Sequence, residues 1–145
     1  MITNDENMKT RILITILLAL MLAPSACTEI SSDHTGPIIS DIAASNNVLV
    51  ISDCLSTSIT ITAKVTDSSD IANVLFWYRV GPDQGFKSDP MQVVDDLYSV
   101  VIKGTDLQGY GYGDLEFYIS AQDAIGNLNK SAVDNHVQFL PCVNN

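Results

Sequence analysis

Residues 58–66 read SITITAKVT, and the alternation within this stretch decides the fold class. Every second residue from Ile59 to Val65 is apolar, and threonine or lysine stands between them. A period of two is typical of an antiparallel strand that buries one face against a core and exposes the other. The isoleucines, threonines and valine supply the β-branched side chains that strands favour.

Two further stretches repeat this alternation. Residues 71–80, IANVLFWYRV, carry their cleaner apolar set at the even positions from Val74 to Val80, so the mixed odd set is expected to face outward. Residues 115–122, LEFYISAQ, alternate with the odd positions inward. An N-terminal strand broken into residues 38–43 and 48–51 is expected, with weaker strands at 91–94, 97–102 and 136–140. A glycine-rich loop is expected at 104–113. About seven short strands without any helical period predict an all-β sandwich of immunoglobulin or fibronectin III type.

Length, charge and composition limit the number of domains and the classes of protein to which the chain can belong. A chain of 145 residues holds one domain of ordinary size. Its net charge of −10 argues against a nucleic-acid partner, which requires a basic surface. An apolar content of 46% with only 17% charged residues argues against a disordered acidic tail.

The N-terminal region predicts export. Residues 12–23, ILITILLALMLA, form an apolar run of 12 residues, which suits a signal peptide and is shorter than the about 20 residues of a membrane span. Lys9 and Arg11 supply the positive charge before it. Asp5 and Glu6 are unusual there, so a true start at Met8 is a hypothesis. The predicted organisation is a signal peptide at 1–26, an anchor cysteine and flexible tether at 27–36, and the sandwich at 37–145.

Ser25-Ala26-Cys27 resembles the end of a bacterial lipobox, in which the cysteine receives a lipid. Pro24 departs from the leucine usual in that motif, and an ordinary secretory signal cut near Ala26 is the alternative. Either interpretation places the protein outside the cytoplasm, at the cell surface or in the periplasm. The lipid on Cys27 would make the membrane its first partner.

Two cysteines remain once Cys27 is assigned to the lipid. Cys54 and Cys142 bracket nearly the whole domain, and an even pair in an exported chain predicts one disulfide. Closing so long a loop stabilises by about 4–5 kcal/mol in the chain-entropy account. Two free thiols are the alternative, and the lack of a C-x-x-C motif disfavours a redox role.

A resemblance to a family rests on these strands together. The series ITAKVTD, VLFWYR and YISAQDAIGN, set between Cys54 and Cys142, resembles bacterial surface Ig-like domains of the fibronectin III type. Their late strand often reads Y-x-A-x-D-x-x-G-N, and residues 118–127 carry one extra residue between tyrosine and alanine. The resemblance covers about residues 36–143. It implies a binding, adhesion or spacer module.

Catalytic motifs are not found in the sequence. There is no G-x-S-x-G elbow, phosphate-binding glycine loop or H-E-x-x-H motif. His34 lies in the expected tether and His136 near the last strand, so neither suggests a metal pair. The chain is therefore expected to be non-catalytic.

Acidic residues in turns suggest one candidate site. In the sandwich topology three turns would meet at one end, which would bring carboxylates and an amide together as ligands for Ca²⁺. The candidates are Asp67, Asp70, Asp95, Asp96, Asp123 and Asn127. The alternative is that these residues serve the turns themselves and solubility. No other cofactor is expected.

The outward face of residues 71–80 suggests a second site. Leu75, Trp77 and Arg79 would lie beside Tyr118 and form an aromatic patch that stacks on sugars or anchors a protein. The alternative is that Phe86 and its loop cover Trp77. The loop with Tyr110 and Tyr112, ahead of the strand at 115–122, has two alternatives: a contact loop, or the structural tyrosine corner that the resemblance implies.

Overall fold

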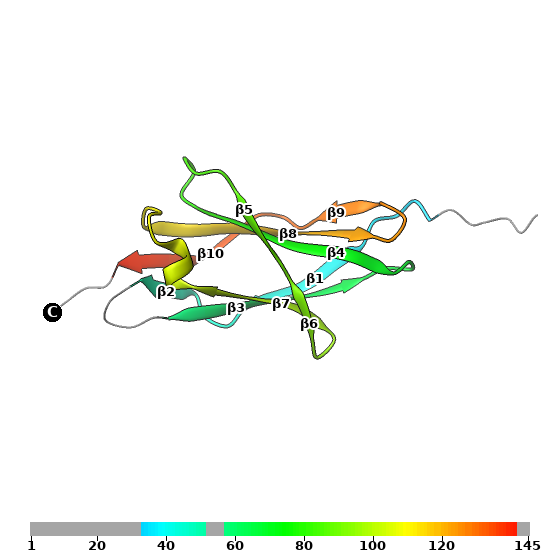
Figure 1. The fold of residues 1–145 in the computed structure, drawn as a ribbon, viewed down its shortest axis with the longest axis horizontal. Helices are drawn as coiled ribbons and strands as arrows, with labels where there is room; N and C mark the ends of the chain where they lie inside the picture. The colour runs from blue at the N-terminus through cyan, green and yellow to red at the C-terminus, as the bar shows by residue number, and fades with distance from the viewer. Residues whose placement is uncertain (1–32, 52–56, 142–145) are drawn as a thin grey trace, which may run out of the picture. The chain divides into compact units, whose positions relative to one another are not determined.

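Two β-sheets pack face to face in the computed structural model, which describes residues 33–51 and 57–141 (Figure 1). The first sheet has the order β1 (Ile38–Ala44), β3 (Ser58–Thr66), β7 (Leu97–Lys103) and β6 (Gln92–Val94). The second has the order β2 (Val48–Ile51), β10 (Asp134–Pro141), β8 (Gly113–Asp123), β4 (Ile71–Val80) and β5 (Lys87–Pro90), with β9 (Leu128–Lys130) also beside β8. The architecture is a β-sandwich.

The core is built by the predicted alternation. All four inward residues of β3 are buried, and so are the even positions of β4 from Val74 to Val80 and the odd positions of β8 from Leu115 to Asp123. Phe76 and Phe139 have no exposed surface, and each such side chain stabilises the fold by roughly 2–3 kcal/mol. The predicted inward and outward faces of these three strands are therefore confirmed.

The N-terminal strand is broken, as expected, and its halves join different sheets. β1 pairs with β3, whereas β2 runs parallel to β10 in the other sheet. Residues 45–47 connect the two sheets, and Gln138 N donates to Asn47 O at 2.8 Å just before β2 begins. A bulge precedes the break, where Asp41 adopts a φ of 51°. Each half thereby covers one free edge of the sandwich.

Three elements were not expected from the sequence. The 3₁₀ turn η1 (Gly104–Leu107) begins the segment predicted as a loop, and its Leu107 is fully buried. Strands β5 and β9 read KSDP and LNK, which contain no alternation of apolar residues. Both are held by backbone pairing to a longer neighbour, which side-chain patterns do not reveal.

Cys27, Cys54 and Cys142 lie outside the described residues, so lipidation and the disulfide stay predictions. Among the described residues, no helix has the length and apolar character needed to span a membrane. The described residues form one compact unit.

The turn between β6 and β7 generates a stability prediction. Asp95 and Asp96 connect the paired residues Val94 and Leu97 with φ values of 49° and 65°, the two positive angles of a type I′ hairpin turn. Glycine adopts these angles without the Cβ penalty. We expect Asp96→Gly to stabilise by roughly 0.5–1 kcal/mol and to raise Tm by about 2–5 °C in a thermal melt. Asp83→Gly, an exposed aspartate without a positive φ, is the control and is expected to leave Tm unchanged or lower.

Candidate binding face

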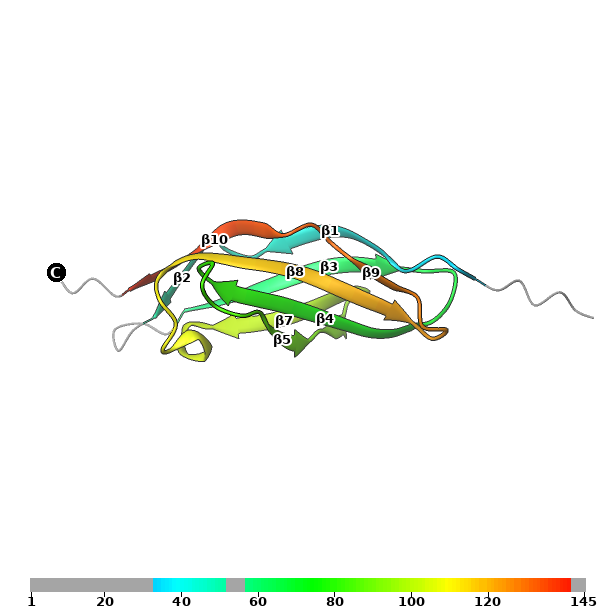
Figure 2. The ribbon, with the colours of Figure 1, turned by 90° about the horizontal axis from the view of Figure 1, so that it is seen from above.

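The outer face of the β4–β8 pair presents the predicted aromatic patch. The register sets Trp77 opposite Tyr118, Leu75 opposite Ser120, and Arg79 opposite Glu116. Because residues directly opposite on one face of a sheet lie within side-chain contact, these pairs form a continuous surface. Figure 2 shows this sheet in front of the other, with β9, β8 and β4 side by side.

The two aromatic rings are held in a defined orientation. Trp77 and Tyr118 are stacked, with ring centroids 5.9 Å apart and an angle of 5° between the planes. Trp77 Nε1 donates to Ser120 Oγ at 2.9 Å, which uses the only polar group of the indole. The tryptophan is thus a fixed apolar plate whose position is set before any ligand arrives.

Phe86 closes one end of the patch. Its ring meets Tyr118 edge-on at 5.1 Å, and the Arg79 guanidinium lies 4.6 Å from its centroid. Arg79 also donates from Nη2 and Nε to Glu116 Oε2 at 2.6 and 2.8 Å. Phe86 therefore covers Tyr118 from one side, whereas the alternative expected it to cover Trp77. Arg79 is engaged by Glu116 and Phe86 instead of facing a ligand.

A shallow groove of about 460 Å³ remains on this face. It crosses β4, β8 and β9 and is lined by Asn73, Leu75, Trp77, Tyr118, Ser120, Gln122, Leu128 and Lys130. An aromatic floor with amides and a hydroxyl along it can stack on an apolar ring face and hydrogen-bond to polar groups at the ring edge. Leu75, Trp77 and Tyr118 from the predicted face line the groove, and Arg79 does not.

The acidic turn residues are divided between two places. Asp67 and Asp123 come together, joined by Asp33, with one carboxylate oxygen of each within 4.8 Å of the others. Asp70 lies at the same turn, where its carbonyl accepts from Ala124 N at 2.8 Å. Asp95 and Asp96 do not join this group; Figure 1 shows the β6–β7 turn at the lower edge, away from the turns after β3 and β8. The expectation that they share one tip with the others is corrected, because a two-residue hairpin directs them elsewhere.

Asp123 organises the turn after β8. Its side chain is 2% exposed, and Oδ1 accepts from the backbone N–H groups of Ile125 and Asn127 at 3.0 and 2.8 Å. Asn127 Nδ2 donates to Asp123 Oδ2 at 2.8 Å and to the carbonyl oxygens of Asp33 and Thr35. Gly126 has a φ of 99°, a positive angle that glycine adopts without the Cβ penalty. The turn thus holds the N-terminal segment through one asparagine side chain.

Asp33 anchors that segment from the other side. Its carboxylate accepts from Thr35, from Ser68 Oγ at 2.5 Å and from Ser69 Oγ at 3.0 Å. The hydrogen bond from Ser68, followed by those from Thr35, holds the pKa of Asp33 well below its usual range. Residues 33–36 were expected in a flexible tether, whereas here they lie against the sandwich. The Asp33-His34-Thr35 spacing allows a local Asx-type turn, but the docking depends on Ser68 and Ser69, which lie 35 and 36 residues further along the chain.

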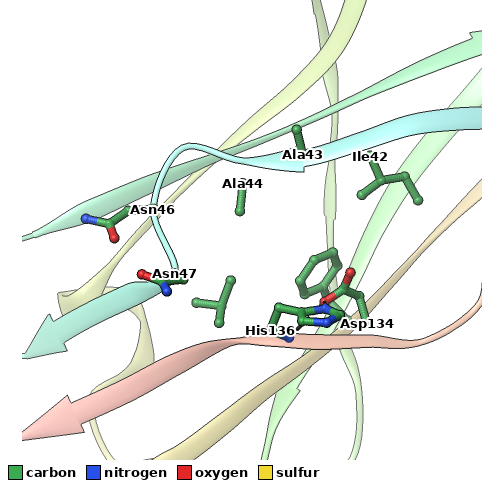
Figure 3. A pocket seen from close by; sticks show the side chains of 9 residues that line it. Ile42, Ala43, Ala44, Asn46, Asn47, Asp134 and His136 are labelled. Carbon is green, nitrogen blue, oxygen red and sulfur yellow. Dashed lines mark hydrogen bonds and ion pairs between the residues drawn. The ribbon is translucent and has the colours of Figure 1, made fainter.

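A second, smaller cavity of about 260 Å³ lies between β1 and β10 (Figure 3). His136 Nδ1 is 2.8 Å from Asp134 Oδ1, and the two side chains face Ala43 and Ala44 across the gap. No serine, threonine or cysteine is among the described residues that line it, so the pair has no hydroxyl or thiol to activate.

His34 is exposed, and neither histidine belongs to the acidic group. Of the two tyrosines considered for a structural corner, Tyr110 packs on the core and Tyr112 is 58% exposed.

Comparison with known proteins gives no relative: no family model matches the chain, and no curated sequence matches it significantly. The function is therefore argued from the geometry of the face.

The hydrogen bonds to Asp33 generate a pH prediction. A carboxyl whose folded-state pKa is depressed stabilises the protein above its unfolded pKa of about 3.9, and this contribution is lost as the pH falls below that value. Asp33→Asn, in which one oxygen becomes a donor, should be less stable than the wild type at pH 6. The difference in free energy of unfolding between the wild type and Asp33→Asn should be smaller at pH 3 than at pH 6, as measured by urea unfolding at both pH values. The control Asp83→Asn should show the same change in free energy of unfolding with pH as the wild type. A difference between Asp33→Asn and the wild type that is equal at pH 6 and pH 3 contradicts the lowered pKa of Asp33.

Calcium binding at Asp67, Asp70, Asp123 and Asn127 stays a prediction from the sequence. The carboxylates of Asp33 and Asp123 already accept internal hydrogen bonds, so the turn has partners without an ion. The test is a thermal melt of a chain beginning at residue 28, in EDTA and in millimolar Ca²⁺. If the folded protein binds Ca²⁺, Tm should be several degrees higher in Ca²⁺ than in EDTA, and Mg²⁺ should not raise it. An unchanged Tm contradicts the prediction.

Proposed function

We propose that the chain is an exported, non-catalytic module of the fibronectin III or Ig-like type that binds saccharides on the outer face of its β4–β8–β9 sheet. The groove with the stacked Trp77 and Tyr118 is the observation that carries this proposal. Binding or adhesion at the cell envelope is the role that follows.

The strand order supports the fold type. In the usual letters the first sheet is A-B-E-D, and the second is G-F-C with an added C′ strand. The first strand changes sheets and continues parallel to the last. This order, with the crossing of the first strand between sheets, supports an Ig-like or fibronectin III type of sandwich.

The ends of β2 and β10 favour the predicted disulfide, which belongs to an exported protein. Ile51 pairs with Pro141 in parallel register. Cys54 follows Ile51 by three residues and Cys142 directly follows Pro141, so the chain segments that lead to both cysteines begin side by side. Together with residues 12–23 and the Ser25-Ala26-Cys27 motif, this supports export and anchoring by a lipid on Cys27.

A saccharide fits the groove better than a protein surface does. Pyranose rings present C–H groups on one face and hydroxyls at the rim, which matches an aromatic plate flanked by Asn73, Ser120 and Gln122. A stable protein interface buries about 800 Å² on each partner around an apolar centre. Of the apolar side chains that line the groove, Leu75, Trp77 and Tyr118 are half-buried, and only Leu128 is strongly exposed, at 66%. A spacer in an envelope assembly would need no such groove.

Trp77→Ala tests the proposal. We expect the wild type to be retarded in affinity electrophoresis through gels containing at least one of xyloglucan, mannan, alginate or polygalacturonate. Loss of the stacking plate should weaken that binding at least tenfold, or by about 1.4 kcal/mol or more, because stacking on an aromatic ring supplies energy of this size.

Tyr112→Ala, which removes an exposed aromatic ring away from the groove, is the matched control and should retain binding. Thermal melts of both variants separate lost binding from lost folding, and Trp77→Phe supplies a milder change if alanine destabilises the sheet. Retardation of a folded Trp77→Ala variant equal to that of the wild type contradicts the proposed site. No retardation of the wild type in any gel contradicts saccharide binding.

A further inference from the structure

The charge around the groove differs from that of the rest of the chain. The sequence has 17 acidic residues against 7 basic ones, yet no described residue that lines the groove is acidic. Lys130 is the one basic residue among them. The nearest outward acid of β8, Glu116, forms an ion pair with Arg79. A small region without acidic side chains, carrying a single cation, therefore lies on an otherwise acidic protein.

The position of Lys130 places its charge at the rim of the aromatic plate. In the paired strands Lys130 stands opposite Ser120, and Ser120 stands opposite Leu75. Neighbouring strands are about 4.8 Å apart, so the β9 lysine lies about 10 Å across the sheet from β4. A ring resting on Trp77 and Ser120 would thus direct a substituent toward the Lys130 ammonium group.

We propose that the groove selects an acidic saccharide, one whose sugar rings carry carboxylates, and that Lys130 recognises the carboxylate. This inference rests on the proposed saccharide-binding function and deepens it. Trp77 receives the apolar face of the ring, and Asn73 and Gln122 serve its hydroxyls. Gln122 Nε2 donates to Gly126 O at 3.3 Å, which leaves its Oε1 as the acceptor. Lys130 supplies a charge-assisted hydrogen bond, which is stronger than a neutral one.

An acidic peptide would satisfy the lysine but not the rest of the groove. Extended peptides gain affinity by adding to a sheet edge through main-chain hydrogen bonds. The groove lies on the face of the sheet, and its two central strands, β4 and β8, are paired with a neighbour on each side, so their backbone groups are already used. The saccharide is the occupant that uses the plate, the amides and the charge together.

The test compares each polymer with its uncharged form. Polygalacturonate, alginate and hyaluronan are each paired with the carboxyl-reduced polymer, which has the same linkages without the charge. Affinities of the full chain in mild detergent are measured by titration calorimetry at 50 and 300 mM NaCl. For at least one pair, we expect about tenfold tighter binding of the acidic form at low salt, and a smaller preference at high salt.

Lys130→Gln should reduce that preference to within twofold and leave the affinity for the reduced polymer unchanged. Lys64→Gln, which removes an exposed lysine from the outward face of β3 in the other sheet, is the control and should retain the preference. Binding of polyglutamate equal to that of the uronate polymers would overturn the inference, because charge alone would then explain it.

The two proposals fail differently. Equal binding of acidic and reduced forms, or a preference that survives Lys130→Gln, overturns the acidic selectivity and leaves saccharide binding intact. Binding to neutral polymers alone would likewise overturn the acidic selectivity and leave saccharide binding intact. Binding to none of the acidic, reduced or neutral polymers overturns both.

Discussion

The pairing of β4 with β8 is the constraint on which the rest of the molecule depends. It runs from Ile71 opposite Asp123 to Val80 opposite Leu115. A slip of one residue would exchange every side chain between the two faces. The same register therefore buries Phe76 against Phe117, whose ring centroids are 5.2 Å apart, and presents Trp77 beside Tyr118 on the outside. Core and binding face are two consequences of one alignment.

The end of the sandwich around the turn after β8 shows how polar groups complete such a fold. Asp123 is buried, yet its carboxylate meets backbone donors of its own turn, so burial costs no unpaired charge. Asn127 then extends this network to the N-terminal segment, which Asp33 secures through Ser68 and Ser69. Among the described residues, no buried side-chain polar atom lacks a hydrogen-bond partner. The aspartates of this end thus have structural partners, and the proposed binding face lies on the sheet.

Alternation explains what could be predicted. Strands 58–66 and 71–80 have the predicted bounds and faces because a one-sided core imposes a period of two. β5, β9 and the docking of residues 33–36 depend on backbone pairing and on side chains from distant turns, which one sequence does not display. Leu75, Trp77 and Tyr118 were predicted together, since outward positions follow from the same period. Ser120, Gln122 and Lys130 were missed because their partnership depends on register across three strands.

The most direct test of the central claim is a nuclear magnetic resonance titration. A ¹⁵N-labelled chain beginning at residue 28 is titrated with an oligosaccharide of the polymer it binds, and backbone amide shifts are followed. The account predicts that the shifted amides cluster on β4, β8 and β9, around Leu75, Trp77, Ser120 and Lys130. Shifts confined to the turn at Asp123, or to the cavity between β1 and β10, would contradict it.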